Sequence, residues 1–513
     1  MKLAHTIAVI AVSIPLGLSA QDTAPVPPTA GPPSGGKTDL DYAQKVFDIS
    51  RSEAVERREA AEALEAEIEK ISNAFPDNLI GTFLEEKPTR VVLVFDGDVP
   101  AAELNKLATP KLRRFLKTKR SRFTKTELTS FQEQLIALLP DSGGSAFIGY
   151  SHKNDRFNVE IEGVDAAQTF RQALPQTLRS ITKVTEAATG STQWTGQRVG
   201  FADEPENYGS NQVAYSGFPL LNSGRFVCTL GFVSHDYNTQ AAGVITGGHC
   251  PDNLSVSYTN YDGSSRSLGA FDVKRYESAG SVSYDYKHYP ATSIPYKRGY
   301  MWFDASTVGH FSHACDYAGA NCTKESFANV DVALPSKGWL KVRYAQQAGG
   351  TPSSNLGHPE GSIRCKMGMT SGFSCGIIAE QSGYIQLRMR QDDTTNTTFN
   401  GVVRVRAQDF AVASYYGDSG GPVFSRPTWN SGIGWWEVTA AGTLIGGTVK
   451  GDGTLNAKRD RPCVMNLKSR FGTTETLDTD CAFVYMPIDR VNDHKPSIAI
   501  KTLVGEQDSY VIP

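Results

Sequence analysis

Hydrophobic residues near the amino terminus recur at the spacing of a helix. The apolar positions lie among many Glu and Arg residues and are Val55, Ala61, Leu64, Ile68 and Ile71. This pattern predicts an amphipathic helix that ends before Pro76, since proline cannot continue a helix. A second helical stretch is expected from about Glu103 to Leu139.

Short apolar runs between these helical stretches predict strands instead. They are Val91–Phe95, Phe147–Tyr150 and Phe157–Glu162. Residues 40–195 are therefore expected to form an α+β domain, and this part of the chain contains no cysteine.

The pattern changes beyond about residue 200. Short apolar or aromatic runs now alternate with Gly, Ser, Asn and Asp, and few helical periods occur. This alternation of short apolar runs with turn-forming residues is typical of an all-β fold. With 513 residues the chain exceeds what one hydrophobic core usually supports, so we expect two or three domains.

The first 20 residues have the pattern of a cleaved secretory signal. Lys2 precedes an apolar run from Ile7 to Leu18, and the small residues Ser19 and Ala20 follow. The run is too short to span a bilayer. A buried strand is the alternative, which the Pro-rich segment 21–39 disfavours because that segment reads as a disordered linker.

Charge and the absence of later apolar stretches narrow the classes of function. The formal net charge is −3 and the isoelectric point is near 6.3, which argues against a nucleic-acid partner. No later stretch approaches the length of a transmembrane helix, so we expect a secreted, extracellular protein with no membrane contact.

One serine lies in a turn of residues that mostly lack bulky side chains, Gly417-Asp418-Ser419-Gly420-Gly421-Pro422. Glycines allow backbone angles closed to other residues, so the N–H groups of Gly417 and Ser419 can point the same way and form an oxyanion hole. A serine hydroxyl is a weak nucleophile, so this hypothesis requires a histidine base and an acid that orients it.

The candidate base is His249, in the segment Gly243-Val244-Ile245-Thr246-Gly247-Gly248-His249-Cys250. The motif TGGHC followed far downstream by GDSGGP resembles the chymotrypsin-like serine peptidases, and most of all their bacterial branch of streptogrisins and alpha-lytic protease. The segment from Ile363 to Gly376 resembles the disulfide-closed hairpin of that branch. The resemblance spans roughly residues 210 to 495.

The resemblance implies an all-β fold of two antiparallel β-barrels, preceded by a smaller α+β pro-region. The first barrel, residues 196–335, would carry the His and the Asp, and the second, residues 336–513, would carry Ser419. It also implies a monomer that needs no cofactor or metal, whose partners are protein or peptide substrates and its own pro-region.

Two aspartates compete for the role of the acid. Asp285 lies 36 residues after His249 and follows a hairpin-like run, as the acid does in the bacterial branch. Asp331, in Asp-Val-Ala-Leu, lies 82 residues after His249 and looks like the pattern of animal relatives. We favour Asp285. The acid would hold the imidazole tautomer whose free nitrogen faces the serine.

Export implies an oxidising compartment, so the eight cysteines predict four disulfides. The resemblance implies Cys228 with Cys250 and Cys365 with Cys375. Proximity alone suggests Cys315 with Cys322 and Cys463 with Cys481. A zinc site of His310, His313, Cys315 and Cys322 is the less favoured alternative.

Three positions are expected to contact substrate. Gly446 and Gly447 resemble the strand that walls the specificity pocket and pairs with the substrate backbone, although Ile445 replaces the serine usual in relatives. Ala413 stands where basic-specific relatives place an aspartate. We therefore expect cleavage after uncharged side chains, apolar or aromatic, because an unpaired buried cation is costly.

Two other classes of function compete with the peptidase reading, and the first of them fails. The α/β-hydrolase elbow fits Gly417-x-Ser419-x-Gly421, but that fold needs a helix at the serine and a later histidine, whereas Pro422 begins a strand-like run. The other is a catalytically weak or inactive homologue that acts as a secreted binding protein. The region 21–195 is likewise either a pro-region that assists folding or a retained accessory domain.

Overall fold

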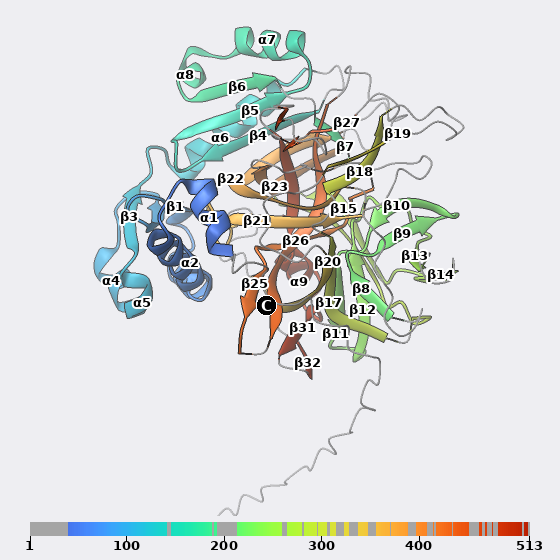
Figure 1. Ribbon diagram of the computed structural model, residues 1–513. Helices are drawn as coiled ribbons and strands as arrows, with labels where there is room; N and C mark the ends of the chain where they lie inside the picture. Colours follow the sequence, from blue (N-terminus) through green and yellow to red (C-terminus); the bar gives the residue numbers. More distant parts are fainter. Residues whose placement is uncertain are drawn as a thin grey trace, which may run out of the picture.

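The computed structural model describes most of the chain between residues 39 and 510 (Figure 1). The described residues are 39–140, 145–186, 189–191, 213–258, 264–279, 282–294, 296–304, 308–313, 323–327, 337–346, 355–369, 371–387, 397–407, 414, 417–432, 434–450, 461–463, 467–468, 474–475, 481–504 and 507–510. The predicted signal 1–20, almost all of the linker 21–39, and Ala413, Asp331, Cys315 and Cys322 lie outside them.

The N-terminal region, residues 39–186, is an α+β structure, as predicted. Its elements are α1 (Asp39–Phe47), α2 (Arg51–Glu65), α3 (Ile68–Ala74), β1 (Leu79–Glu85), β2 (Arg90–Phe95), α4 (Ala101–Leu107), α5 (Pro110–Arg113), β3 (Leu116–Arg120), α6 (Lys125–Ala137), β4 (Ala146–Ser151), β5 (Arg156–Ile161), α7 (Val164–Ala173), α8 (Gln176–Arg179) and β6 (Thr182–Glu186). None of the helices in the described part of the chain is long and apolar enough to cross a membrane.

Local sequence explains where the longer helices begin. Ser50 Oγ accepts a hydrogen bond from the backbone N–H of Glu53, and the Glu53 carboxylate accepts one from the backbone N–H of Ser50, which starts α2. Thr124 and Glu127 form the same reciprocal cap for α6. Such capping boxes satisfy backbone donors that have no partner inside the helix.

The expected helix from Glu103 to Leu139 is wrong in its middle. Pro110 begins the short helix α5, and residues Leu116–Arg120 form β3. This strand pairs in parallel with β2, so that Leu116 lies opposite Val91. The pairing with an already buried strand outweighs the helical preference of these Lys and Leu residues.

The β-rich region, residues 213–510, follows. Its strands are β8 (Val213–Ser216), β9 (Pro219–Asn222), β10 (Arg225–Thr229), β11 (Phe232–Asp236), β12 (Ala241–Thr246), β13 (Ser255–Tyr258), β14 (Ser264–Ser267), β15 (Val273–Ala279), β16 (Val282–Tyr289), β17 (Tyr296–Asp304), β18 (Val308–His313), β19 (Thr323–Phe327), β20 (Lys337–Ala345), β21 (Ile363–Gly368), β22 (Gly372–Leu387), β23 (Thr397–Ala407), β24 (Pro422–Ser425), β25 (Thr428–Asn430), β26 (Trp435–Lys450), β27 (Arg461–Pro462), β28 (Leu467–Lys468), β29 (Thr474–Glu475), β30 (Ala482–Pro487), β31 (Ile498–Val504) and β32 (Gln507–Tyr510). The short helix α9 (Asp489–His494) precedes β31.

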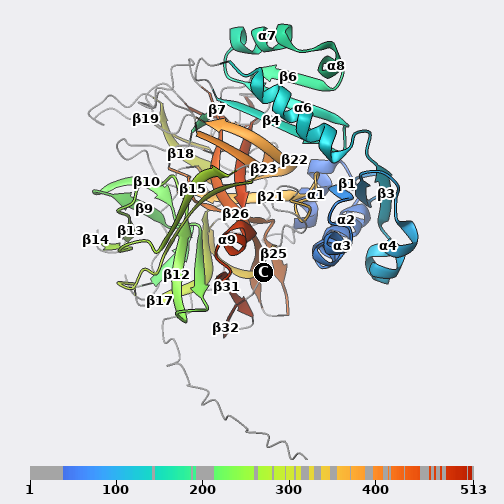
Figure 2. The ribbon, with the colours of Figure 1, turned by 180° about the vertical axis from the view of Figure 1, so that it is seen from behind.

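Two of the sheets carry the candidate site. One has the strand order β15-β16-β12-β11-β31-β32, and the largest contains β21, β22, β24 and β26. The C-terminal strand β31 pairs with β11, so it joins the sheet of the His249 segment across the division expected at residue 335. In the view from behind, α9 lies beside β31 (Figure 2).

The N-terminal region is joined to the β-rich region through strand edges. Strand β4 pairs antiparallel with β22, with Ile148 opposite Tyr384, and so extends the largest sheet (Figure 1). Farther along, β7 (Thr189–Ser191) pairs antiparallel with β26. Main-chain hydrogen bonds of added strands give affinity with little dependence on side chains.

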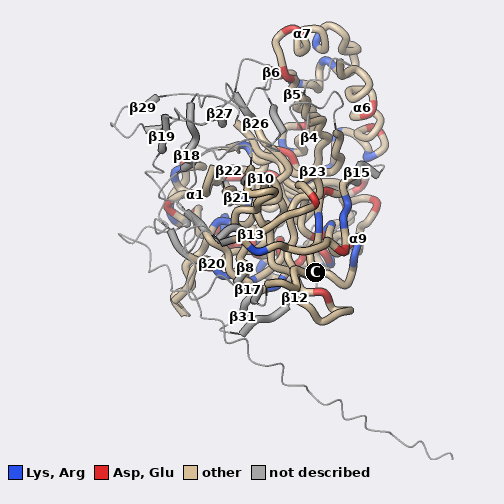
Figure 3. Tube along the Cα trace, turned by 90° about the vertical axis from the view of Figure 1, so that its right-hand side faces the viewer, with Lys and Arg blue, Asp and Glu red and all other residues tan. Residues whose placement is uncertain are grey.

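Buried polar groups also cross this contact. The carboxylate of Glu360 accepts hydrogen bonds from Ser151 Oγ at 2.8 Å and from the amides of His152 and Lys153 at 2.8 and 3.2 Å. Arg404 is paired with Glu160 of the N-terminal region and with Glu380 of its own region. Along the rest of the described chain, basic residues (blue) and acidic residues (red) are interspersed (Figure 3).

We predict that Glu360 makes the folded chain less stable as pH rises. Burial raises the pKa of this carboxyl to about 8 against an ordinary 4.5, and the three hydrogen bonds oppose the rise. The protonated acid therefore favours the folded state, and its contribution is full below pH 4.5 and lost as pH rises toward 8. The slope is at most about 1.4 kcal/mol per pH unit.

The measurement is thermal unfolding between pH 5 and 9, in a Ser419→Ala background that lacks the candidate nucleophile. Glu360→Gln keeps the shape of the side chain without its ionisation, so its unfolding temperature should fall less across this range than that of the parent. Parallel pH profiles for the two proteins would contradict the prediction.

Candidate active site

His249 lies in a tight turn directly after β12. The turn is tied to β10 by the Cys228–Cys250 disulfide and by a 2.8 Å hydrogen bond from Thr246 Oγ1 to the carbonyl of Thr229. Gly248 packs so closely on the β15–β16 hairpin that an added Cβ would come within 2.3 Å of the Arg275 carbonyl oxygen. A residue with a side chain therefore does not fit at this position.

Asp285 holds His249 at two points. Its Oδ2 lies 2.7 Å from Nδ1 of the imidazole, and its Oδ1 accepts the backbone N–H of His249 at 2.8 Å. Both side chains are almost completely buried. With Nδ1 donating to the carboxylate, the neutral ring keeps its lone pair on Nε2, at the opposite edge.

Asp285 lies beside His249 because its strand, β16, pairs with a neighbouring strand on each side. On one side β16 pairs with β12, with Lys287 opposite Thr246, and on the other with β15, with Asp285 opposite Tyr276. Asp331, the other candidate acid, lies outside the described residues.

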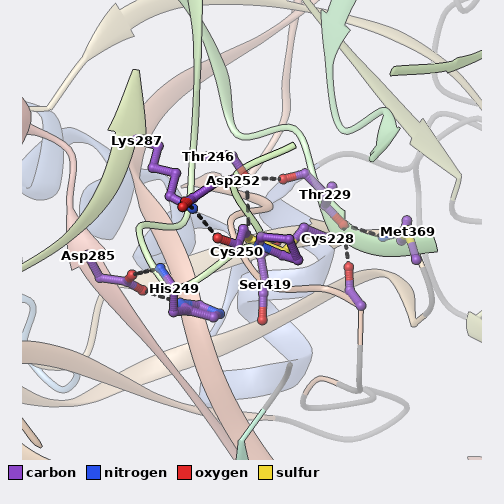
Figure 4. Close-up of a disulfide and its surroundings, with 12 residues drawn as sticks. Cys228, Thr229, Thr246, His249, Cys250, Asp252, Asp285, Lys287, Met369 and Ser419 are labelled. Carbon is purple, nitrogen blue, oxygen red and sulfur yellow. Dashed lines mark hydrogen bonds and ion pairs between the residues drawn. A yellow bond between two sulfur atoms is a disulfide. The ribbon is translucent and has the colours of Figure 1, made fainter. Parts of the chain in front are cut away.

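Ser419 lies at the edge of the His249 ring that faces away from Asp285 (Figure 4). It is buried, and its carbonyl accepts the N–H of Thr229 at 2.8 Å. Gly417 and Gly420 flank it with φ angles of +95° and +77°, in the region that side chains disfavour. Gly420 has a second reason to be glycine, because an added Cβ would come within 2.4 Å of the Gly247 nitrogen.

The Ser419 turn is anchored by a buried ion pair that the sequence did not reveal. Lys366 Nζ lies 3.4 Å from Asp418 Oδ2, and both side chains are fully buried. Ser371 adds its hydroxyl and its amide to the same carboxylate, the amide at 3.0 Å from Oδ1. Burial lowers the pKa of Lys366, and the charge of Asp418 opposes that shift.

Lys366 comes from the hairpin of β21 and β22, which the Cys365–Cys375 disulfide closes. The ion pair therefore ties that hairpin to the residue directly before the candidate nucleophile, Ser419. Cys463 and Cys481 are also bonded, so three of the four predicted disulfides are present among the described residues.

The predicted substrate wall is covered by the chain itself. Gly446 pairs with Ser191 and Gly447 with Gly190, both of β7. An added Cβ on Gly447 would come within 2.1 Å of Ser414 Oγ, so this position leaves no room for a side chain. Ile445 is buried beside them and brings no side-chain hydrogen-bonding group to the site.

Comparisons with known proteins find similarity among solved structures only. No family model matches this chain, and neither does any curated protein. The chain is similar to a Cellulomonas bogoriensis chymotrypsin (15% identity, TM-score 0.28, 57% of this chain and 100% of the other). It is also similar to the active form of the Rv3671c protease from M. tuberculosis (12% identity, TM-score 0.22, 59% of this chain and 96% of the other). At these TM-scores the functional conclusion rests on the geometry of the site.

We predict that Lys366→Met destabilises the protein by about 3–5 kcal/mol, because it leaves the Asp418 carboxylate buried without its cation. Adding Asp418→Asn should recover most of that loss, since the neutral amide needs no cation. Urea denaturation of the single and double variants measures both effects. Equal losses in the two variants would show that the ion pair does not anchor the turn.

Proposed function

We propose that the chain is a secreted serine endopeptidase made as a pre-pro-enzyme. The observation that carries the proposal is the two-point hold of Asp285 on His249, with Ser419 at the opposite edge of the same imidazole. A buried carboxylate, an imidazole and a serine hydroxyl in this order form the arrangement that activates a nucleophile. In this proposal, two β-barrels of the chymotrypsin-like type contribute the His249 and Ser419 sides.

The proposed reaction proceeds through an acyl-enzyme. His249 Nε2 takes the hydroxyl proton as Ser419 Oγ attacks the peptide carbonyl, and then gives that proton to the leaving amine. Asp285 stabilises the imidazolium in between. The N–H groups of Gly417 and Ser419 would bind the oxyanion, and water then releases the acyl group by the same steps. No step requires a cofactor.

We predict that Ser419→Ala and His249→Ala each abolish nearly all peptidase activity, and that the double variant is no worse than either. The residues act as one unit, so their effects should not add. Asp285→Asn should lower kcat by about four orders of magnitude, because the amide favours the wrong imidazole tautomer. Turnover of a peptide library by the purified proteins is the measurement.

The matched control is Asp272→Asn, because Asp272 forms a second His–Asp pair with His288 Nδ1 at 2.6 Å near the same hairpin. It should retain activity, and Asp331→Asn should also do little. If Asp331→Asn is the inactive variant, or if the losses from Ser419→Ala and His249→Ala add, the assignment of the triad is wrong.

We also propose that residues 21–195 are a pro-region that inhibits the enzyme until it is removed. The pairing of β7 with Gly446 and Gly447 supports this, because it occupies the strand proposed to bind substrate. Strand β7 runs antiparallel to β26, so its last residue, Ser191, lies at the end of this pairing that is nearer to Leu444. Leu444 exchanges hydrogen bonds of 2.8 and 2.9 Å with Gly420 and Gly421, next to Ser419.

Because Ser191 ends β7 on the side nearer to Ser419, we predict proteolytic cleavage in the segment directly after β7, residues 192–200. The Ser419→Ala chain should stay covalently intact, whereas the wild-type chain should yield a mature form whose amino terminus falls in that segment. Mass spectrometry of both purified proteins measures this. A secreted wild-type product that retains residues 40–190 would favour the accessory-domain alternative.

Residues 196–513 expressed alone should give little active enzyme, and the pro-region added as a separate chain should restore some. Most contacts of a β-rich fold are non-local, so its folding barrier is high, and a docked partner would lower it. Efficient unaided refolding would count against this role.

A further inference from the structure

A fully buried lysine lies on the same strand as Asp285, two residues farther along. The side chain of Lys287 is 0% exposed, and its ammonium donates to the backbone carbonyl of Cys250 and to Asp252 Oδ1, the latter at 2.6 Å. Both acceptors lie in the turn directly after His249 (Figure 4). Lys287 therefore connects the strand that carries the acid to the turn that carries the base.

The register makes this connection rigid. Residues two apart in a strand face the same side, so Asp285 and Lys287 are both directed at the His249 turn. Asp285 accepts the backbone N–H of His249, and Lys287 donates to the backbone carbonyl of Cys250. Two anchors of opposite charge on one strand thus hold consecutive residues of the turn.

Keeping an ammonium in this place is costly. Burial lowers the pKa of Lys287, and its bond to Asp252 opposes that shift. Asp252 is half exposed and is shared with Lys274 at 2.9 Å, so it offsets the cost only in part. A hydrophobic residue would fill the same space more cheaply, which indicates that the charge and its directed bonds serve the site.

We propose that Lys287 is a positioning residue for His249: it fixes the turn so that the imidazole stays between Asp285 and Ser419. The proposal rests on the proposed peptidase function. The charge of Asp285 in turn opposes the lowering of the Lys287 pKa, so the two buried groups attract each other.

The test compares Lys287→Met with wild type, each expressed as the full chain and allowed to mature. Active enzyme is counted by titration with a fluorophosphonate. We expect kcat to fall by about ten- to a hundredfold, because small misplacements of a catalytic group are costly. KM should stay within about twofold, because among the described residues Lys287 contacts Cys250, Asp252 and Phe271 rather than Gly446 or Gly447.

A double-variant cycle separates positioning from general stability. In an Asp285→Asn background, where the imidazole has already lost its acid, Lys287→Met should lower kcat far less than in wild type. Lys341→Met is the matched control, since Lys341 is also buried but lies on β20 and contacts the Trp435 ring instead. It should lower the unfolding temperature and leave kcat unchanged.

If Lys287→Met does not accumulate as folded protein, the variant Asp252→Asn provides the test instead. This substitution weakens the ion pair between Lys287 and the half-exposed Asp252, so it should also lower kcat, by a few-fold. Unchanged kcat in the variant that folds, or equal losses in the wild-type and Asp285→Asn backgrounds, would overturn the proposal. An inactive wild-type enzyme would instead refute the proposed function.

Discussion

The double hydrogen bond between Asp285 and His249 is the constraint on which the rest of the site depends. A buried carboxylate needs partners, and here one histidine supplies both a ring nitrogen and a backbone amide. That arrangement is possible only because β12 and β16 are neighbours and because Gly248 lets the turn approach the hairpin. The fold therefore fixes the imidazole before any substrate arrives.

The opposite side of the imidazole is fixed by a separate set of contacts. The ion pair of Lys366 and Asp418 holds the Ser419 turn from the β21–β22 hairpin, while Thr229 bonds both to that turn and to Thr246. The two sides of the site thus meet through main-chain and buried polar contacts. Buried polar networks of this kind specify one arrangement at the expense of raw stability.

The contact with the N-terminal region includes buried charged groups beside apolar ones. Arg404, Glu160 and Glu380 form a buried charge cluster, and Glu360 is capped by the β4–β5 turn. Buried ion pairs contribute less stability than apolar packing of the same volume. Both faces carry groups that water can solvate, which is consistent with the proposed pro-region, a partner that would bind during folding and later leave.

The sequence singled out residues of the candidate site but not the connections between them. His249 and Ser419 lie in motifs that contain glycines, and these glycines are required by close backbone contacts. Such motifs can be found from the residue types alone. Lys366 and Lys287 were missed, because a lone lysine in a strand pattern usually means a solvated side chain. Strand β7, with the sequence Thr189-Gly190-Ser191, has no apolar pattern, so hydrophobic periodicity cannot detect it.

Long-range pairing accounts for the remaining differences. Leu116–Arg120 reads as helix by local preference, but β2 offers it a partner strand. The C-terminal strand β31 joins the sheet of β11, a contact between segments far apart in sequence. Local patterns do not encode such partners, so the predicted domain division could not include them.

The most direct measurement is covalent labelling of the matured protein with a fluorophosphonate, followed by peptide mapping of the modified residue. The probe reacts with a serine only when a neighbouring base activates it. The account predicts one labelled residue, Ser419, with labelling lost in His249→Ala. Labelling at another residue, or equal labelling of Ser419 without His249, would contradict it.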